Sequence, residues 1–338
     1  MATHHVNHSD VRIAIVGFGD IAKKHIAAMR ALGANIVAAA NRSPEGRRKA
    51  EQDGGIERTY ADAQTMVERE RPDGVLVSAS VLSQFEVVRN LIPYGVPLLV
   101  EKPPAVSLED WNSLRGQIEA RQLPFMVAMN RRYYSVYDRA LQRMGGVEAV
   151  TSVSVEWSED PEKMLALGHP AEMIPLLNFS TSIHGLDLLG FFAGIPRNPG
   201  LWGRNLDGSG DSFRWQMCLH GQTERGAYAR FESTWDVPGR WRVVVDAPNI
   251  RMVSAPLETA VLYARGRVPE TIEASVEDQQ FKPGFYGQAA AFLELIRNHS
   301  YSAWPMASLG EISADMELAD TLTRACQKSS AAEARAPQ

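Results

Sequence analysis

The fold is decided by residues 11–22, which read Val11-Arg12-Ile13-Ala14-Ile15-Val16-Gly17-Phe18-Gly19-Asp20-Ile21-Ala22. The first half is an apolar, β-branched run, which is typical of a parallel strand covered by helices on both faces. The second half has the pattern Gly-x-Gly-x-x-Ala and leads into a helical pattern that extends to Leu32. The stretch therefore predicts a strand, a tight glycine turn and a helix.

The glycine turn has the pattern of a dinucleotide-binding loop. Gly17 allows the tight turn, Gly19 lets a pyrophosphate approach the backbone, and Ala22 lets helix and strand pack closely. A phosphate would bind the unpaired N–H groups at the helix start, where the helix dipole also favours an anion. A purely structural turn is the alternative, and we favour dinucleotide binding. The expected contacts in this loop are Gly17, Phe18, Gly19, Asp20 and Ile21.

Length, composition and charge exclude several classes of protein. The chain has 338 residues, 45% of them hydrophobic, so it can bury a large core, and two domains are expected. The net charge is -5 and the largest basic block is Arg47-Arg48-Lys49, so neither nucleic acid nor an anionic membrane is an expected partner. No apolar run approaches the roughly 20 residues that a membrane-spanning helix needs.

The N-terminus and the cysteines indicate the compartment. Residues 1–10 are polar and lack the apolar segment of a secretory signal. Cys218 and Cys326 are too few and too far apart to suggest a disulfide framework or a zinc site. We therefore expect a cytoplasmic protein with no bound metal.

The first third of the chain alternates strand and helix patterns. Strands are predicted over residues 11–16, 35–40, 74–79, 97–100 and 124–129, with a short one at 59–60. Helices are predicted between them over residues 20–32, 44–52, 61–70, 83–94 and 108–120. This alternation predicts a doubly wound parallel sheet with right-handed crossovers, whose ligand lies at the carboxyl ends of the strands.

The second strand is followed by Asn41-Arg42-Ser43-Pro44-Glu45, which bears on the choice of cofactor. Where NAD binds, a carboxylate is expected here to accept hydrogen bonds from the ribose hydroxyls, and Asn41 is neutral. The guanidinium of Arg42 could pair with a 2′-phosphate and stack on adenine, which favours NADP over NAD. The alternatives are a solvated surface charge for Arg42 and a plain helix cap for Ser43.

Two further strand ends carry polar residues. The fourth strand is followed by Ser78-Ala79-Ser80 and the fifth by Glu101-Lys102-Pro103-Pro104. We expect Ser80 and Lys102 to contact the cofactor, because this edge of the sheet is where the nicotinamide end would lie. The ammonium of Lys102 can donate a hydrogen bond to a substrate oxygen and transfer a proton. A solvated surface lysine is the alternative.

The chain changes character from about Arg131 onward. A helix is predicted from Asn178 to a stop at Gly194, with Ser180, His184 and Asp187 on one face at i, i+4 and i+7. His184 could exchange the proton that accompanies hydride transfer, and the alternative is a packed core histidine. Asp187 either orients His184 or pairs with a basic group elsewhere.

The remainder of the chain has strand patterns followed by two helical ones. Strands over residues 213–220, 226–234 and 240–245, joined by Gly and Pro turns, predict a mostly antiparallel sheet. Residues 285–297 and 309–326 have the apolar spacing of amphipathic helices.

Together these motifs resemble the glucose-fructose oxidoreductase and myo-inositol dehydrogenase family of NAD(P)-dependent enzymes, over nearly the whole chain. The resemblance rests on Gly17-Phe18-Gly19-Asp20-Ile21-Ala22, Glu101-Lys102-Pro103, Asn130-Arg131-Arg132-Tyr133, Ile183-His184-Gly185-Leu186-Asp187 and Tyr286-Gly287-Gln288 with Phe292. It implies a Rossmann domain over residues 1–130 and an α/β domain with a large, mostly antiparallel open sheet over 131–284. Helices over 285–330 would pack back near the Rossmann domain, and the open sheet would form the interface of a homo-oligomer, a dimer or tetramer.

The resemblance also implies roles for single residues. Lys102 and His184 become the catalytic pair, and Glu101 lies beside the nicotinamide. Hydride would pass between nicotinamide and a hydroxyl-bearing carbon of a sugar, cyclic polyol or related carbohydrate. In oxidation His184 would accept the hydroxyl proton while Lys102 stabilises the alkoxide, and reduction would reverse both roles. The expected substrate contacts are Arg132, Tyr133, Ser180, Asp187 and Tyr286. For Arg132, Tyr133 and Tyr286 the alternative is a plain packing or surface role.

Two departures from the family pattern leave other functions open. Many members have Asp four residues before the catalytic His, where this chain has Ser180, and Gln84 stands where a His is common. Ser180 cannot carry a negative charge, so the proton relay or the substrate must differ. The alternatives are a redox-neutral, NAD-dependent glycosidase of the same family and a non-catalytic cofactor-binding sensor. Retention of both Lys102 and His184 argues against the sensor.

Overall fold

The computed structural model describes residues 9–206, 213–235, 237, 241–299 and 304–333. Its internal contacts divide the chain into two compact units. The first consists of Met1–Tyr133 with Val276–Leu309, and the second of Tyr134–Ser275 with Gly310–Gln338. The polar leader expected over residues 1–10 lies almost wholly outside the described residues. In the part of the chain that is described, no helix has the length and apolar character needed to cross a membrane.

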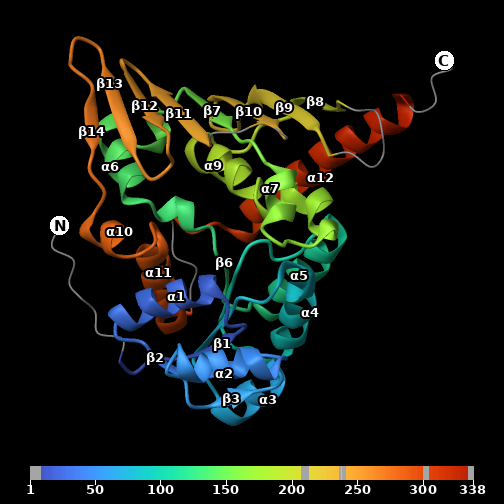
Figure 1. The fold of residues 1–338 in the computed structure, drawn as a ribbon. Coiled ribbons are helices and arrows are strands. Elements are labelled where there is room, and N and C mark those ends of the chain that lie inside the picture. The colour runs from blue at the N-terminus through green and yellow to red at the C-terminus, as the bar shows by residue number, and fades with distance from the viewer. Residues whose placement is uncertain (1–8, 207–212, 236, 238–240, 300–303, 334–338) are drawn as a thin grey trace. The chain divides into compact units, whose positions relative to one another are not determined.

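The first unit contains a six-stranded parallel sheet with the strand order β3-β2-β1-β4-β5-β6 (Figure 1). Its strands are β1 (Arg12–Val16), β2 (Asn35–Ala40), β3 (Thr59–Tyr60), β4 (Gly74–Val77), β5 (Leu98–Val100) and β6 (Phe125–Val127). The order reverses between β1 and β4, which are hydrogen-bonded neighbours. The predicted doubly wound parallel sheet is confirmed, and ligands of such sheets bind where the order reverses.

Three helices of this unit begin at a residue whose side chain caps them. The helices of the unit are α1 (Asp20–Ala31), α2 (Pro44–Gln52), α3 (Ala63–Glu70), α4 (Val81–Leu91), α5 (Leu108–Arg121), α10 (Val276–Gln280) and α11 (Phe285–Asn298), with short 3-10 turns η1 (Ile92–Tyr94) and η2 (Asn130–Tyr133). The side chains of Ser43, Asp62 and Ser107, at the starts of α2, α3 and α5, each accept a hydrogen bond from a first-turn N–H. Such caps satisfy backbone donors that a helix leaves open.

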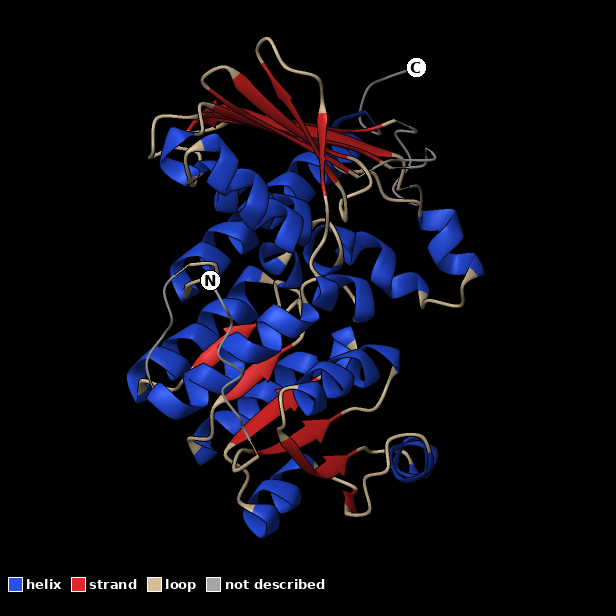
Figure 2. Ribbon diagram, turned by 90° about the vertical axis from the view of Figure 1, so that its left-hand side faces the viewer, coloured by secondary structure: helices blue, strands red, loops and turns tan. Residues whose placement is uncertain are grey.

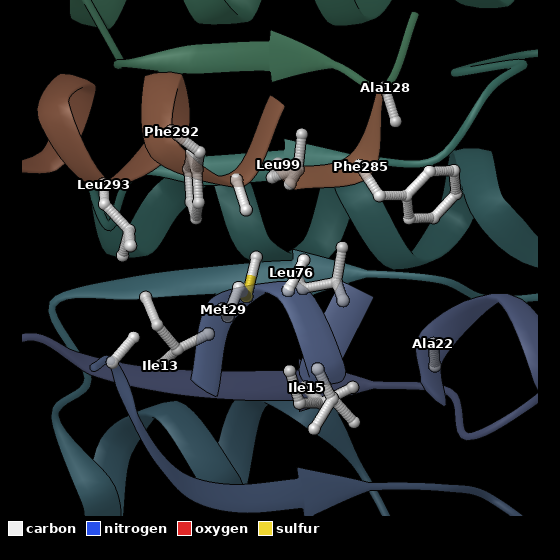
Figure 3. Close-up of a cluster of buried hydrophobic side chains, with 14 of the residues drawn as sticks. Ile13, Ile15, Ala22, Met29, Leu76, Leu99, Ala128, Phe285, Phe292 and Leu293 are labelled. Carbon is white, nitrogen blue, oxygen red and sulfur yellow. The ribbon is translucent and has the colours of Figure 1, made fainter. Parts of the chain in front are cut away.

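The core of the first unit joins segments that are far apart in sequence. Ile13 and Ile15 of β1 and Met29 of α1 lie in one buried cluster with Phe292 and Leu293 of α11 (Figure 3). The packing of β4 against α11 leaves no spare volume, since a Cβ on Gly74 would lie 2.5 Å from Cδ1 of Ile296. Helix α11 is therefore part of the core that supports the parallel sheet.

The second unit contains an eight-stranded sheet with the order β14-β13-β12-β11-β7-β10-β9-β8. Its strands are β7 (Ser152–Glu156), β8 (Gly200–Asn205), β9 (Trp215–Gln222), β10 (Tyr228–Thr234), β11 (Arg242–Ala247), β12 (Ile250–Ser254), β13 (Ala260–Ala264) and β14 (Glu270–Ile272). All neighbours are antiparallel except β7 and β10. The predicted large, mostly antiparallel sheet is confirmed.

Helices lie along one face of this sheet, and the described chain places none on the other (Figure 2). They are α6 (Ser135–Met144), α7 (Pro161–Ala166), α8 (Leu177–Ser180), α9 (Ile183–Ala193) and α12 (Leu309–Glu333), with η3 (Val147–Ala149) and η4 (Ala171–Leu176). Buried and more exposed residues alternate along β7 and β10, as in a sheet with one open face.

The two late helices belong to different units by their contacts. Helix α11 packs in the first unit, whereas α12 is grouped with the second from Gly310 onward. Asn178 Nδ2 donates a hydrogen bond of 2.9 Å to Thr323 Oγ1 on α12. A Cβ on Gly203 of β8 would lie 2.9 Å from Cβ of Ala325, so α12 sits directly on this strand. The expectation that the late helices pack back near the first domain stays a prediction.

The single helix predicted from Asn178 to Gly194 is wrong in one respect, because it is broken at Thr181 and Ser182. The N–H groups of these two residues both donate 2.9 Å hydrogen bonds to Leu177 O. Thr181 Oγ1 donates to the same carbonyl at 3.0 Å, so the side chain competes with the helical pattern. Ser180 therefore ends α8 and is not on one continuous helical face with residues of α9. The predicted stop at Gly194 is found.

Candidate active site

The glycine loop follows β1 and its two glycines are required for different reasons. Gly17 has φ +85°, and a Cβ there would lie 2.2 Å from Ser78 O on β4's exit. Gly19 has φ −98° and is the N-cap of α1, and its Cβ would meet no heavy atom within 4 Å. The described protein leaves the space at Gly19 open. This fits a loop that a pyrophosphate approaches closely.

The other expected loop contacts differ in what they can present to a cofactor. The side chain of Phe18 is buried in the core, and Lys23 Nζ lies 5.7 Å from its ring centroid. Only the backbone of Phe18 can therefore contact a ligand. Asp20 and Ile21 are exposed in the first turn of α1, where N–H groups have no intrahelical partner.

The turn between β2 and α2 separates Arg42 from its two neighbours. Asn41 Oδ1 accepts hydrogen bonds of 3.2 Å from Ser43 N and Ser43 Oγ, and Ser43 Oγ accepts from Gly46 N at 3.0 Å. Arg47 Nη1 donates to the carbonyls of Asn41 and Arg42 at 2.9 and 3.0 Å. Arg42 itself is exposed. The turn is thus held by the side chains around Arg42, whose guanidinium faces solvent.

The strand ends of β4 and β5 are tied together by a buried glutamine. Gln84 of α4 is 1% exposed, and its Nε2 donates to Glu101 O and, at 2.7 Å, to Pro103 O. Ser80 lies at the N-cap of α4, with its Oγ 2.6 Å from Ser83 Oγ. Gln84, noted in the sequence as a departure, therefore holds the main chain of the Glu-Lys-Pro segment.

Glu101 and Lys102 follow β5 at the carboxyl edge of the sheet, and the Lys102–Pro103 peptide is cis. Glu101 Oε1 lies 2.7 Å from His25 Nε2, and Glu101 Oε2 accepts from Lys102 N at 3.2 Å. Burial raises the pKa of Glu101, but the hydrogen bond and charge of His25, with Lys102 and Lys282, outweigh it and lower the pKa overall. A negative charge is thus held next to Lys102.

Arg132, Tyr133 and Tyr286 come from two neighbouring elements of the first unit, η2 and α11. A Cβ on Gly287 would lie 3.4 Å from Cβ of Tyr133, so the two elements are in contact. Arg132 is 3% exposed, and Tyr286 stacks on Phe281 with centroids 5.6 Å apart. Burial, followed by the charge of Glu277, raises the pKa of Tyr286, so its hydroxyl remains a hydrogen-bond donor.

In the second unit His184 lies in the first turn of α9 and Asp187 one turn later. Ser180 is 3%, His184 6% and Asp187 0% exposed, so all three are buried. Glu159 is a further buried carboxylate at this helix start. Its Oε1 accepts from Ser182 Oγ at 2.8 Å and from Trp157 Nε1 at 2.9 Å. A carboxylate at this end of a helix is favoured by the dipole.

The structure thus forms two groups, one in each unit. The first combines the glycine loop, the Arg42 turn, Ser80 and the Glu101–Lys102 segment at the carboxyl ends of β1, β2, β4 and β5. The second combines His184, Asp187 and Ser180 around the break between α8 and α9. Sequence reasoning missed His25 and Glu159. A polar residue on an otherwise buried helix face was the available signal for His25.

The sequence model of the GFO_IDH_MocA family, described as an oxidoreductase family with an NAD-binding Rossmann fold, matches residues 11–129. This match covers the parallel sheet, the glycine loop and the Glu-Lys-Pro segment. Residues 11–129 belong to this oxidoreductase family. The predicted resemblance is therefore confirmed for the domain that carries its most specific motif.

Curated relatives match between about a third and a half of the chain. D-apiose dehydrogenase from Paraburkholderia graminis is 34% identical over 121 residues, which are 36% of this chain and 32% of that protein. Myo-inositol dehydrogenase Hyg17 from Streptomyces leeuwenhoekii is 27% identical over 154 residues, 44% of this chain and 47% of the relative. The matched segment spans about a third of the length of the D-apiose dehydrogenases.

Solved structures of a dehydrogenase and an oxidoreductase match nearly the whole chain in fold. A dehydrogenase from Chromobacterium violaceum has a TM-score of 0.80 at 16% identity, covering 96% of this chain and 97% of the other. An oxidoreductase from Agrobacterium radiobacter, solved with NAD+, L-tartaric acid and magnesium, has a TM-score of 0.74 at 17% identity, covering 95% and 96%. The fold of nearly the whole chain, with both of its sheets, is thus shared with these structures.

Proposed function

We propose that the chain is an NAD(P)-dependent oxidoreductase that moves a hydride between nicotinamide and a hydroxyl-bearing carbon of a sugar, cyclic polyol or related carbohydrate. The observation that carries the proposal is the position of Lys102. It follows β5, and β5 and β1 are the two neighbours of β4 in the sheet, so Lys102 and the glycine loop share one edge. The ionised carboxylate of Glu101 lies beside it. A lysine placed in this way can stabilise an alkoxide.

The residues present fit a bound dinucleotide. The open space at Gly19 and the exposed first turn of α1 would hold the pyrophosphate, with Ser80 and Glu101 toward the nicotinamide end. When bound, the cofactor supplies the hydride acceptor or donor. Lys102 donates a hydrogen bond to the reacting oxygen of the substrate, and His184 takes the hydroxyl proton in oxidation and returns it in reduction.

The proposed substrate contacts are given for each unit separately. Arg132, Tyr133 and Tyr286 would contact the substrate from the first unit, and Ser180 and Asp187 from the second. Ser180 is a neutral hydrogen-bond partner, so a negative charge in this group of residues would have to come from another side chain, and Asp187 and Glu159 are the carboxylates we propose for it. Both are buried residues on or against α9.

NADP is the favoured cofactor over NAD. The turn after β2 offers no carboxylate for the ribose hydroxyls, and Arg42 is the exposed cation of that turn. Asn41 and Ser43 are occupied in holding the turn and can add hydrogen bonds to the ribose through atoms that remain accessible. A guanidinium recognises a phosphate bidentately.

The substrate class rests on the named relatives. One is a D-apiose dehydrogenase and another a myo-inositol dehydrogenase, and both names specify polyhydroxylated compounds. Ser180 in place of a carboxylate would favour a neutral sugar or polyol over a cationic one, because Ser180 offers hydrogen bonds and no charge.

The test is a panel of sugars, cyclic polyols and nucleotide sugars, each assayed with NAD+ and NADP+. The proposal predicts a net change in nicotinamide absorbance with at least one of them. Cleavage of a glycosidic bond with no net change would instead favour the redox-neutral glycosidase. Saturable cofactor binding with no turnover across the panel would favour the sensor.

We also propose a cytoplasmic homo-oligomer that pairs through the open face of the large sheet. Trp202, Tyr228 and Tyr263 are 49%, 49% and 47% exposed on that sheet. Exposed aromatic groups on one sheet face are typical of an interface. Tyr228→Asp should lower the mass measured by light scattering from a dimer or tetramer toward the monomer.

Both cysteines are free, which suits the reducing compartment proposed for the protein.

A further inference from the structure

A buried histidine connects the dinucleotide-binding helix to the Glu-Lys-Pro segment. His25 lies on α1 and is 0% exposed, and its Nε2 is 2.7 Å from Glu101 Oε1. An ionised carboxylate oxygen can only accept, so Nε2 must carry the hydrogen of this bond. The imidazole ring also packs on Phe285 of α11 with centroids 4.5 Å apart. Its orientation is therefore determined from two sides.

The carboxylate and the main chain of Glu101 are held by several neighbouring groups. His25 of α1 holds Oε1, and the backbone N–H of Lys102 donates to Oε2 at 3.2 Å. Gln84 of α4 holds the carbonyl of Glu101. Lys282, in the segment before α11, is a further cation toward Glu101 and lies 4.9 Å from the Phe285 ring centroid.

Burial and the neighbouring charges act in opposite directions on the ionisation of this carboxyl group. Burial disfavours its ionised form, and the hydrogen bond from His25 is the largest effect that opposes burial, ahead of the charges of His25, Lys102 and Lys282. Without His25 the two lysines alone would have to keep Glu101 ionised. The neighbour of Lys102 would then titrate at a higher pH.

Stability is a weak reason for such a pair. Replacing a buried charged pair by apolar residues of similar volume is often neutral or stabilising, because desolvation offsets the attraction. The pair instead places a fixed negative charge one residue from Lys102. That suits a role in preparing the reacting lysine.

We propose that His25 is a positioning residue that keeps the Glu101 carboxylate ionised and oriented beside Lys102. This rests on the proposed oxidoreductase function for its kinetic consequence, and on the structure alone for the state of Glu101. His25 does not touch the substrate. It acts through Glu101 on the ammonium of Lys102.

Three substitutions separate the hydrogen bond from the packing. His25→Leu removes the donor and retains an apolar side chain, and His25→Gln retains an amide donor of similar reach. Met29→Leu is the matched control, because Met29 is buried on the same helix in the same core. Should His25→Leu fail to fold, His25→Asn, whose amide is too short to reach Glu101, replaces it.

The first measurement is a pH titration of the Glu101 carboxyl carbon by NMR on protein labelled at glutamate, with the signal assigned from Glu101→Gln. We expect the midpoint to rise by about one pH unit or more in His25→Leu, and to stay near the wild-type value in His25→Gln and Met29→Leu. An unchanged midpoint in His25→Leu, or an equal rise in Met29→Leu, would overturn the proposal.

The second measurement uses a substrate found in the sugar panel. Turnover of His25→Leu should fall by about tenfold to a hundredfold, with its acidic limb moved to higher pH, while NADPH binding changes by less than about threefold. A loss of cofactor binding equal to the loss of turnover would overturn the positioning role. The titration needs no substrate, so failure of the whole panel would count against the oxidoreductase and not against His25.

Discussion

A Cβ atom on Gly17 would lie 2.2 Å from the carbonyl oxygen of Ser78, whereas one on Gly19 would meet no heavy atom within 4 Å. Gly17→Ala should therefore lower the free energy of unfolding by at least about 2 kcal/mol, since φ is +85° and the β4 exit must move. Gly19→Ala should lower the free energy of unfolding by less than about 1 kcal/mol. It should nevertheless weaken NADPH binding by about tenfold or more, because its methyl group occupies the approach of the pyrophosphate.

Urea unfolding and NADPH fluorescence titration check both halves of this prediction. Equal stability losses in the two variants would contradict the structural difference between the glycines. Unchanged NADPH affinity in Gly19→Ala would show that the pyrophosphate lies elsewhere.

Arg42→Ala should weaken NADP+ binding by about 2 kcal/mol, roughly thirtyfold, and leave NAD+ nearly unchanged. The reason is the loss of a charged hydrogen bond to the 2′-phosphate. Arg48→Ala is the matched control, because Arg48 is an exposed arginine on the adjacent helix. Calorimetric titration with both cofactors measures the difference. The same loss for NAD+ and NADP+ would exclude a phosphate role for Arg42.

Lys102→Met and His184→Asn should each leave cofactor binding intact and reduce turnover. Lys102→Met removes the ammonium that stabilises the alkoxide, which should lower kcat by a factor of about 10² to 10³. His184→Asn removes a positioned proton acceptor, which should lower kcat by a factor of about 10² to 10⁴. Steady-state kinetics on a substrate from the panel, with NADPH titration alongside, checks both. Normal turnover in either variant would remove that residue from the catalytic pair.

The Asp246 carboxylate should contribute stability that depends on pH. The hydrogen bonds from Arg251 at 2.6 and 3.0 Å lower its pKa, with burial opposing and Ser152 assisting. A lowered folded pKa means that the contribution is present above the unfolded pKa and is lost as pH falls through the folded one.

Asp246→Asn should therefore lower the free energy of unfolding by about 0.5 to 1 kcal/mol near neutral pH, because solvent largely screens the pair, and this loss should vanish once the pH lies below the lowered folded pKa of Asp246. Urea unfolding at several pH values measures this. Glu232→Gln, on an exposed residue of the same sheet, is the control. A cost for Asp246→Asn that grows on acidification would reverse the predicted sign.

Cys326 should be inert in the native protein. It is 0% exposed, and burial raises the pKa of its thiol to about 12. Only Cys218 should therefore react with a thiol reagent in mildly alkaline buffer, and Cys218→Ser should react only after unfolding. Fast modification of Cys326 in the folded state would show that α12 opens from β8 under native conditions.

Local sequence was sufficient for the elements of the parallel sheet. The ranges predicted for the second strand and second helix, 35–40 and 44–52, are those of β2 and α2. An apolar β-branched run and a Ser-Pro helix start are signals within a few residues of the element that they define. The position of Lys102 at a strand end followed from the same alternation.

Contacts between distant residues could not be predicted in this way. His25 and Glu101 are 76 residues apart, and nothing around either indicates the other. The break before α9 depends on Thr181 turning back to Leu177 and on Ser182 donating to Glu159, 23 residues away. A helical periodicity alone continues through this point. Tertiary hydrogen bonding therefore decided the position of Ser180.

The return of α11 to the first unit affects how the chain can fold as it is synthesised. Strands β1 to β6 leave the ribosome early, but Phe285, Phe292 and Leu293, which complete their core, follow only after the whole large sheet has been made. Domains normally fold in the order of synthesis. Here the nucleotide-binding unit cannot complete its core until α11 has been synthesised, and its apolar surface stays exposed to water until then. A chain ended by a premature stop within the second unit would therefore be a target for chaperones and proteases rather than a stable nucleotide-binding fragment.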